Sequence, residues 1–129
     1  MNKTILTKVM NYDTFEESVR HVKKIVSESK FGVLYTIDFG AMSVEKRGVM
    51  MDNYIQLGIC HPDIWFGLLD KDKSFGALLP CPLCIYEDNG EVIVSIVDSE
   101  AQLSIHPSYS KSTLTQKASC LISDLFGKL

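Results

Sequence analysis

The feature that most constrains this chain is an asparagine–glycine turn between two apolar segments. Asp88-Asn89-Gly90 separates residues 85–87 from residues 91–97, and such a turn between apolar runs predicts a β-hairpin. Ser95 is the one polar residue of the run 92–97. A strand that is apolar on both faces is covered on both sides. We therefore expect helices on one face of a sheet, and the terminal helix or a second subunit on the other.

The rest of the chain alternates strand and helix patterns, which predicts one α+β domain over residues 1–129 with the order β-α-β-β-α-β-β-β-α. Asp13 with Glu16 resembles a capping box that opens the first helix. Pro62 suits the first turn of a second helix, and Thr113 with Gln116 suggests a capping box for the last. Residues 39–48 are a loop or a short helix. The predicted strands are residues 4–10, 32–38, 54–60, 75–79, 85–87 and 91–97.

Composition excludes several classes of protein. The chain has 129 residues, 46% hydrophobic and 22% charged, as expected for one globular domain. The net charge of −3 argues against a nucleic-acid partner, because such proteins usually carry basic excess. The uncharged, mostly apolar stretch of residues 75–86 contains two prolines and is shorter than the roughly 20 residues of a spanning helix. No membrane partner is expected. Without a signal peptide, we expect a cytoplasmic protein whose cysteines are mostly reduced.

Two cysteines and a histidine are the best candidates for chemistry. Cys60 precedes the helix that begins at Pro62, and a helix N-terminus stabilises a thiolate, although Asp63 opposes this. Cys81 starts a strand that can run beside Cys60. With His61, the two thiols can form a soft site for zinc or cuprous ion, or a reversible disulfide. Alternatively, both cysteines are small buried core residues, as free cysteine often is.

Two further patterns allow a functional and a structural interpretation. Cys81-Pro82-Leu83-Cys84 matches C-x-x-C, but residues three apart on a strand point to opposite faces, so we expect these sulfurs to diverge. Lys46 and Arg47 lie before Gly48 and can bind a phosphate or carboxylate, or can be solvated surface charges. The sequence contains no P-loop, dinucleotide fingerprint or G-x-S-x-G motif, and it indicates no cofactor.

Three stretches carry a resemblance to a known family. They are Ser43-Val44-Glu45-Lys46-Arg47-Gly48, Tyr54-Ile55-Gln56-Leu57-Gly58-Ile59-Cys60-His61-Pro62 and Phe75-Gly76-Ala77-Leu78-Leu79-Pro80-Cys81. With the order and spacing of the elements, they resemble the domain of unknown function 302 family over nearly the whole chain. The resemblance implies a curved, mainly antiparallel sheet packed by helices, similar to the TATA-box-binding-protein-like group. It also implies a homodimer in many members and no established activity. His61, Pro82 and Cys84 depart from the family pattern.

Three functional hypotheses follow. The first is a binding domain for a small ligand or soft metal in a cleft near Cys60, His61 and Cys81, with Lys46 at the rim. The second is a thiol-dependent redox or sulfur-transfer enzyme, with Cys60 as nucleophile and Cys81 as resolving thiol. The third is a protein-interaction module that uses the sheet face or the terminal helix. Whether the protein is an enzyme is not decided by its sequence.

Overall fold

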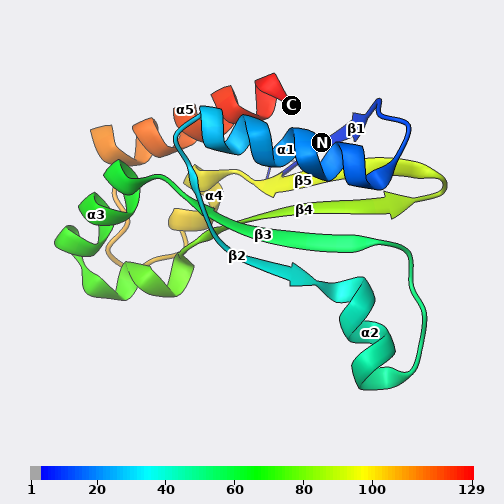
Figure 1. Ribbon diagram of the computed structural model, residues 1–129. Coiled ribbons are helices and arrows are strands. Elements are labelled where there is room, and N and C mark those ends of the chain that lie inside the picture. Colours follow the sequence, from blue (N-terminus) through cyan, green and yellow to red (C-terminus); the bar gives the residue numbers. More distant parts are fainter. Residues whose placement is uncertain (1–3) are drawn as a thin grey trace.

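A five-stranded antiparallel sheet organises the protein, and its two longest helices lie on one face (Figure 1). The computed structural model describes residues 4–129; residues 1–3 of the predicted domain lie outside it. The strand order is β1-β5-β4-β3-β2. The strands are β1 (Ile5–Met10), β2 (Gly32–Asp38), β3 (Tyr54–Cys60), β4 (Cys81–Asp88) and β5 (Glu91–Val97). The predicted α+β class with an antiparallel sheet is confirmed.

The predicted hairpin forms the centre of this sheet. β4 pairs with β5 from Leu83 opposite Ile96 to Asp88 opposite Glu91. Asn89 and Gly90 join them with φ of 51° and 81°, the left-handed conformation that a two-residue hairpin turn requires. Asparagine and glycine adopt this conformation at lower cost than other residues, which explains why the chain reverses here.

Helices α1 (Phe15–Glu28) and α5 (Thr113–Lys128) pack on the same face of the sheet (Figure 1). In both helices the capping residue is the neighbour of the predicted one. Thr14, and not Asp13, caps α1 by accepting a hydrogen bond from the Glu17 backbone N–H at 3.1 Å. Ser112 caps α5 in a capping box completed by Thr115. The main core lies between these helices and the sheet. It includes Val22, Val26, Leu57, Ile59, Leu83, Ile85, Val94, Ile96, Ile122 and Leu125.

The other face of the sheet is covered by no helix within the described residues (Figure 1). Along β5, Val92, Val94 and Ile96 are buried, whereas Ile93 and Ser95 are half-buried. The two sides of this strand are therefore covered unequally. Because α5 lies beside α1, the terminal helix does not cover the second face. Cover by a second subunit stays a prediction.

The strand predicted over residues 75–79 is wrong. This segment belongs to the 3-10 helix η1 (Lys73–Leu78), which follows α3 (Pro62–Lys71). Asp72 starts η1 by accepting hydrogen bonds from the backbone N–H and the hydroxyl of Ser74, at 2.9 and 2.7 Å. Phe75 is buried against α3 and α5 in a second, smaller core. A short apolar run does not by itself distinguish a buried strand from a buried helical turn.

Two further helices complete the chain. α2 (Phe39–Arg47) occupies the segment predicted as a loop or short helix, and α4 (Ser99–Leu103) was not predicted. α2 lies apart from the other helices, beside the end of β2 and the start of β3 (Figure 1). Within residues 4–129, no helix combines the length and apolar character needed to cross a membrane.

Burial of the inner sheet face predicts a sharp contrast between two apolar truncations. Leu57 is fully buried in the main core, and Ile105 is 71% exposed. We expect Leu57→Ala to lower the free energy of unfolding by about 2–5 kcal/mol and Ile105→Ala to change it by less than about 0.5 kcal/mol. Urea unfolding followed by circular dichroism measures both. Similar losses for the two variants would contradict the described core.

Candidate functional site

The two candidate cysteines lie side by side at one end of the sheet. Cys60 is the last residue of β3 and Cys81 the first of β4, and Ile59 is the direct cross-strand partner of Cys81. Both thiols line one small cavity of about 30 Å³ with apolar neighbours such as Ile64 and Leu68. This volume suits one or two water molecules and no larger ligand. Cys60 is 6% and Cys81 8% exposed. The two cysteines are therefore neighbours, as the sequence suggested, but they do not line an open cleft.

Burial keeps these thiols protonated. It raises the pKa of Cys60, and the hydrogen bond from the His61 backbone only partly opposes this. Burial, followed by the nearby Cys60 and Asp98, raises the pKa of Cys81 to about 12. The Cys81 thiol also lies 3.9 Å from the Val97 carbonyl oxygen, to which it donates. A nucleophilic thiol needs a lowered pKa, so the helix N-terminus does not outweigh burial here.

His61 serves as the N-cap of α3. Its Nδ1 atom accepts a hydrogen bond from the Asp63 backbone N–H at 3.3 Å, and its ring meets Phe31 edge-on with centroids 5.4 Å apart. Among residues 4–129, no three His, Cys, Asp or Glu side chains are grouped so that they could hold a metal ion. The contacts of His61 are those of a capping residue.

Cys84 lies on the opposite face of the sheet from Cys81. Cys81 is buried on the helix-covered side, whereas Cys84 is half-buried on the open side, where it pairs with Gln56 of β3. The predicted divergence of the C-x-x-C sulfurs is therefore confirmed by the regular strand β4. The fourth cysteine, Cys120, is exposed on α5.

A larger cleft lies where α2 meets the open face of the sheet. Its volume is about 510 Å³, within the usual range for small-molecule sites, about 300–1,000 Å³. It is lined by Phe39, Met42, Ser43, Lys46, Arg47, Met51, Tyr54 and Gln56. Of the candidate residues from the sequence, Lys46 and Arg47 line this cleft, whereas Cys60, His61 and Cys81 do not. The walls of the cleft come from α2, from the loop that follows it and from the first residues of β3.

The local sequence explains where α2 begins and ends. The Asp38 carboxylate caps the helix by accepting from the Ala41 backbone N–H at 2.9 Å. Gly48 ends it with φ of 67°, a left-handed conformation that favours glycine. The Ser43 hydroxyl then donates to the Val49 carbonyl at 2.7 Å. These signals, Asp38 and Gly48, could have identified the helix from sequence, but not its contact with β3.

Aromatic rings form the floor of the cleft. Phe39 meets Tyr54 edge-on, with centroids 5.6 Å apart and an interplanar angle of 83°. Tyr54 stacks on Tyr86 of β4 at 5.0 Å and 10°. The hydrogen bond with Cys84, followed by burial, raises the pKa of Tyr54 to about 12. Tyr54 therefore presents a neutral hydroxyl at physiological pH.

Hydrogen bonds continue from the cleft across the open face. The Tyr35 hydroxyl donates to Gln56 Oε1 at 3.2 Å, and Gln56 Nε2 lies 3.9 Å from Cys84 Sγ, to which it donates. Farther from α2 on the same face, the hydroxyls of Tyr86 and Ser95 are 2.7 Å apart. Thr7, Ser95, Cys84, Gln56 and Ile37 form one cross-strand row. This row contains no charged side chain.

Comparison with known proteins identifies the family of this chain and a solved structure of the same fold. A model of the family described as domain of unknown function DUF302 matches residues 6–124 of this chain. The chain belongs to the DUF302 family. The crystal structure of an uncharacterized conserved DUF302 protein from Bacillus stearothermophilus matches with a TM-score of 0.82 and 18% identity, covering 99% of this chain and 97% of that one. At this identity the likeness establishes the DUF302 fold alone. The search of curated proteins finds no match.

One more polar group in this DUF302 protein was missed by sequence reasoning. Ser74 Oγ lies 2.7 Å from His106 Nε2, a pairing found in serine nucleophiles. However, His106 Nδ1 accepts from the Ser108 backbone N–H at 2.9 Å, so the neutral ring carries its proton on Nε2 and donates to Ser74. The Ser74 hydroxyl in turn donates to Asp72, which chiefly lowers the pKa of that carboxyl. His106 therefore does not take a proton from Ser74, and the group joins η1 to the loop after α4.

The burial of the cysteines predicts an order of thiol reactivity. Treatment of the native DUF302 protein with iodoacetamide should modify exposed Cys120, and Cys60 and Cys81 should react more than about tenfold slower, because they are buried with raised pKa values. Mass spectrometry of tryptic peptides measures each rate, and the same reaction in denaturant serves as the control. Rapid native alkylation of Cys60 would instead favour the thiol-enzyme hypothesis.

Proposed function

We propose that this protein is a binding domain for a small organic ligand, and that the ligand occupies the cleft between α2 and β3. The observation that carries the proposal is the size of this cleft, about 510 Å³, against about 30 Å³ beside Cys60 and Cys81. Its lining combines large apolar side chains with a few polar groups. Binding sites for small molecules have this composition, since apolar walls supply affinity and polar atoms fix orientation.

The position of α2 supports the same proposal. None of its residues is buried, so this helix adds little to the core despite carrying Phe39 and Met42. Phe39 instead packs on the Tyr54 ring at the floor of the cleft. Met42 and Met51 are exposed, and methionine side chains adapt to ligands of irregular shape. A bound ligand would bury this apolar surface.

The soft-metal and thiol-enzyme hypotheses receive less support. Cys60 and Cys81 are neighbours, but their cavity is narrow, their thiols are held protonated, and His61 Nδ1 is engaged by the Asp63 backbone. An enzyme acting on a substrate through Cys60 needs room for that substrate beside the sulfur. The cleft at α2 has that room, which is why we place the ligand there.

Truncation of the cleft floor should weaken binding of an apolar probe. Phenylnaphthylamine, an uncharged dye whose fluorescence rises in apolar sites, is titrated into the purified protein. We expect Phe39→Ala to weaken its binding about fivefold to thirtyfold, as for loss of about 1–2 kcal/mol of apolar contact. Phe66→Ala, which removes an exposed aromatic ring on α3, is the matched control.

A second cleft variant separates loss of binding from loss of structure. Met51→Gln changes an exposed cleft residue and should weaken the probe about twofold to fivefold without altering the circular dichroism spectrum. If the wild-type protein binds no probe, or if both cleft variants bind as tightly as the wild type, the ligand site is not this cleft.

The uncovered sheet face favours a second candidate function, self-association. At the β1 edge of this face, Ile5 and Val9 are each 44% exposed. On the neighbouring strand β5, half-buried Ile93 lies opposite Val9. These residues form an apolar surface without a covering helix in the described residues, and such surfaces mark interaction sites. A second copy of the chain would cover it, in keeping with the homodimers that the family resemblance implies.

Lysine placed on this surface should prevent self-association. We expect the wild-type protein to be a dimer in analytical ultracentrifugation and Val9→Lys to be a monomer, because burying an unpaired ammonium group is strongly unfavourable. Val44→Lys, at a similarly exposed position on α2, should remain dimeric. A monomeric wild-type protein, or a dimer in Val9→Lys, would refute this interface.

A further inference from the structure

The charge of the α2 cleft is opposite to that of the whole protein. The chain carries 16 acidic and 13 basic residues, yet the cleft lining contains Lys46 and Arg47 and, among the described residues, no aspartate or glutamate. A cleft lined by cations attracts anionic ligands and repels cationic ones. The positive charge of the cleft is therefore a local feature of this acidic protein, and it indicates the charge of the ligand.

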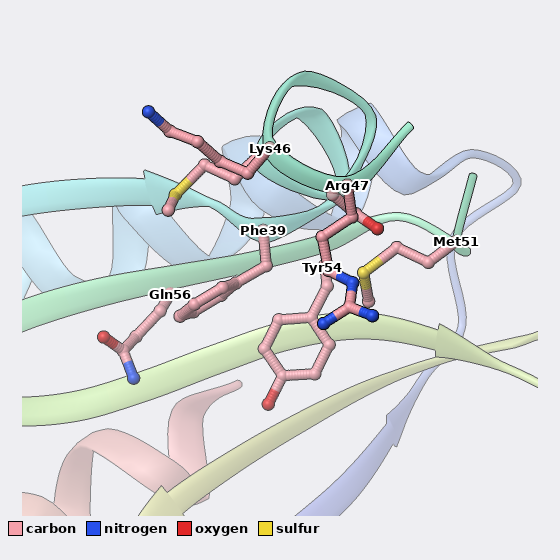
Figure 2. A pocket seen from close by; sticks show the side chains of 8 residues that line it. Phe39, Lys46, Arg47, Met51, Tyr54 and Gln56 are labelled. Atoms are coloured by element: carbon pink, nitrogen blue, oxygen red, sulfur yellow. The ribbon is translucent and has the colours of Figure 1, made fainter. Parts of the chain in front are cut away.

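The two cations of the cleft are not equivalent. Lys46 Nζ lies 3.8 Å from the Glu45 carboxylate, and its side chain points away from Tyr54 in Figure 2. Arg47 makes no ion pair or hydrogen bond through its side chain within residues 4–129. In Figure 2 its side chain points toward Tyr54 and Met51. Arg47 therefore presents unused donors inside the cleft.

A role for Arg47 in helix stability alone does not account for this position. A basic residue in the last turn of a helix offsets the partial negative charge of that end, and both Lys46 and Arg47 occupy the last turn of α2. Lys46 already provides this charge from a solvent-facing position. Arg47 instead points toward Tyr54 (Figure 2), and its guanidinium group can pair with a carboxylate, phosphate or sulfonate through two parallel hydrogen bonds.

The apolar walls define the other half of the ligand. Phe39, Tyr54, Met42 and Met51 line most of the remaining surface. The neutral Tyr54 hydroxyl and the Gln56 amide are already engaged with Cys84 and Tyr35, so they offer few free partners to a polar ligand body. A ligand that fits both halves has an aromatic or aliphatic body and a single anionic group.

We propose that the α2 cleft binds amphipathic organic anions, with the apolar body on Phe39, Tyr54 and the methionines and the anionic head on Arg47. This inference rests on the proposed ligand-binding function and adds the chemical class of the ligand. Carboxylate, phosphate and sulfonate heads share the geometry that Arg47 recognises.

Two dyes with nearly the same aromatic skeleton test this directly. Anilinonaphthalene sulfonate carries an anionic head, and phenylnaphthylamine lacks it. We expect Arg47→Met to weaken binding of the sulfonate about threefold to tenfold and to change binding of the uncharged dye less than about twofold. Arg47→Lys should fall between, because it keeps the charge and loses the paired donors. Added salt should weaken the sulfonate alone.

Arg20→Met is the matched control, since it removes an exposed arginine from α1, away from the cleft, and should leave both dyes unaffected. If both dyes bind equally and Arg47→Met affects neither, the anionic head is refuted while ligand binding in the cleft stands. If neither dye binds, both the cleft function and this inference fail. If Arg20→Met weakens the sulfonate as much as Arg47→Met, the effect is one of net charge and the assignment to Arg47 is wrong.

Discussion

Packing of α1 and α5 against one face of the antiparallel sheet is the interaction on which the rest of the structure depends. The inward residues of β3, β4 and β5, such as Leu57, Leu83 and Val94, are fully buried beneath these helices. Since side chains alternate along a strand, burying this set places Tyr54, Gln56, Cys84 and Ser95 on the opposite face. The chemistry available on the open face is thus a consequence of which residues the core requires.

The same alternation separates the cysteines into different environments. Cys81 faces the helices and Cys84 faces outward, although they are three residues apart. Cys60 ends its strand next to Cys81, where α3 and the apolar residues around it bury both thiols. A thiol in such surroundings is stabilised in its protonated form, which lowers its nucleophilicity near neutral pH. Burial outweighed the favourable field of the helix N-terminus.

The cleft arises where the sheet extends beyond its helical cover. Nearly all of β2 is exposed, and α2 lies beside the end of β2 and the start of β3 without entering the core (Figure 1). This leaves aromatic and methionine side chains in the same cleft as an unpaired guanidinium group, and exposed apolar surface of this kind marks interaction sites. It explains why we place the function of this DUF302 protein on α2 and not at the cysteines.

Local signals in the sequence determined the hairpin at Asn89-Gly90, the boundary between β3 and α3 at Pro62 and the divergence of Cys81 from Cys84. Each depends on turn conformation or strand alternation, which act over a few residues. Only the tertiary structure decided that residues 75–78 are helical, that α5 lies beside α1, and that Arg47 and Tyr54 line the same cleft. The physical reason is that burial and side-chain contact between distant segments depend on how the elements pack, and a single sequence carries no direct record of that packing.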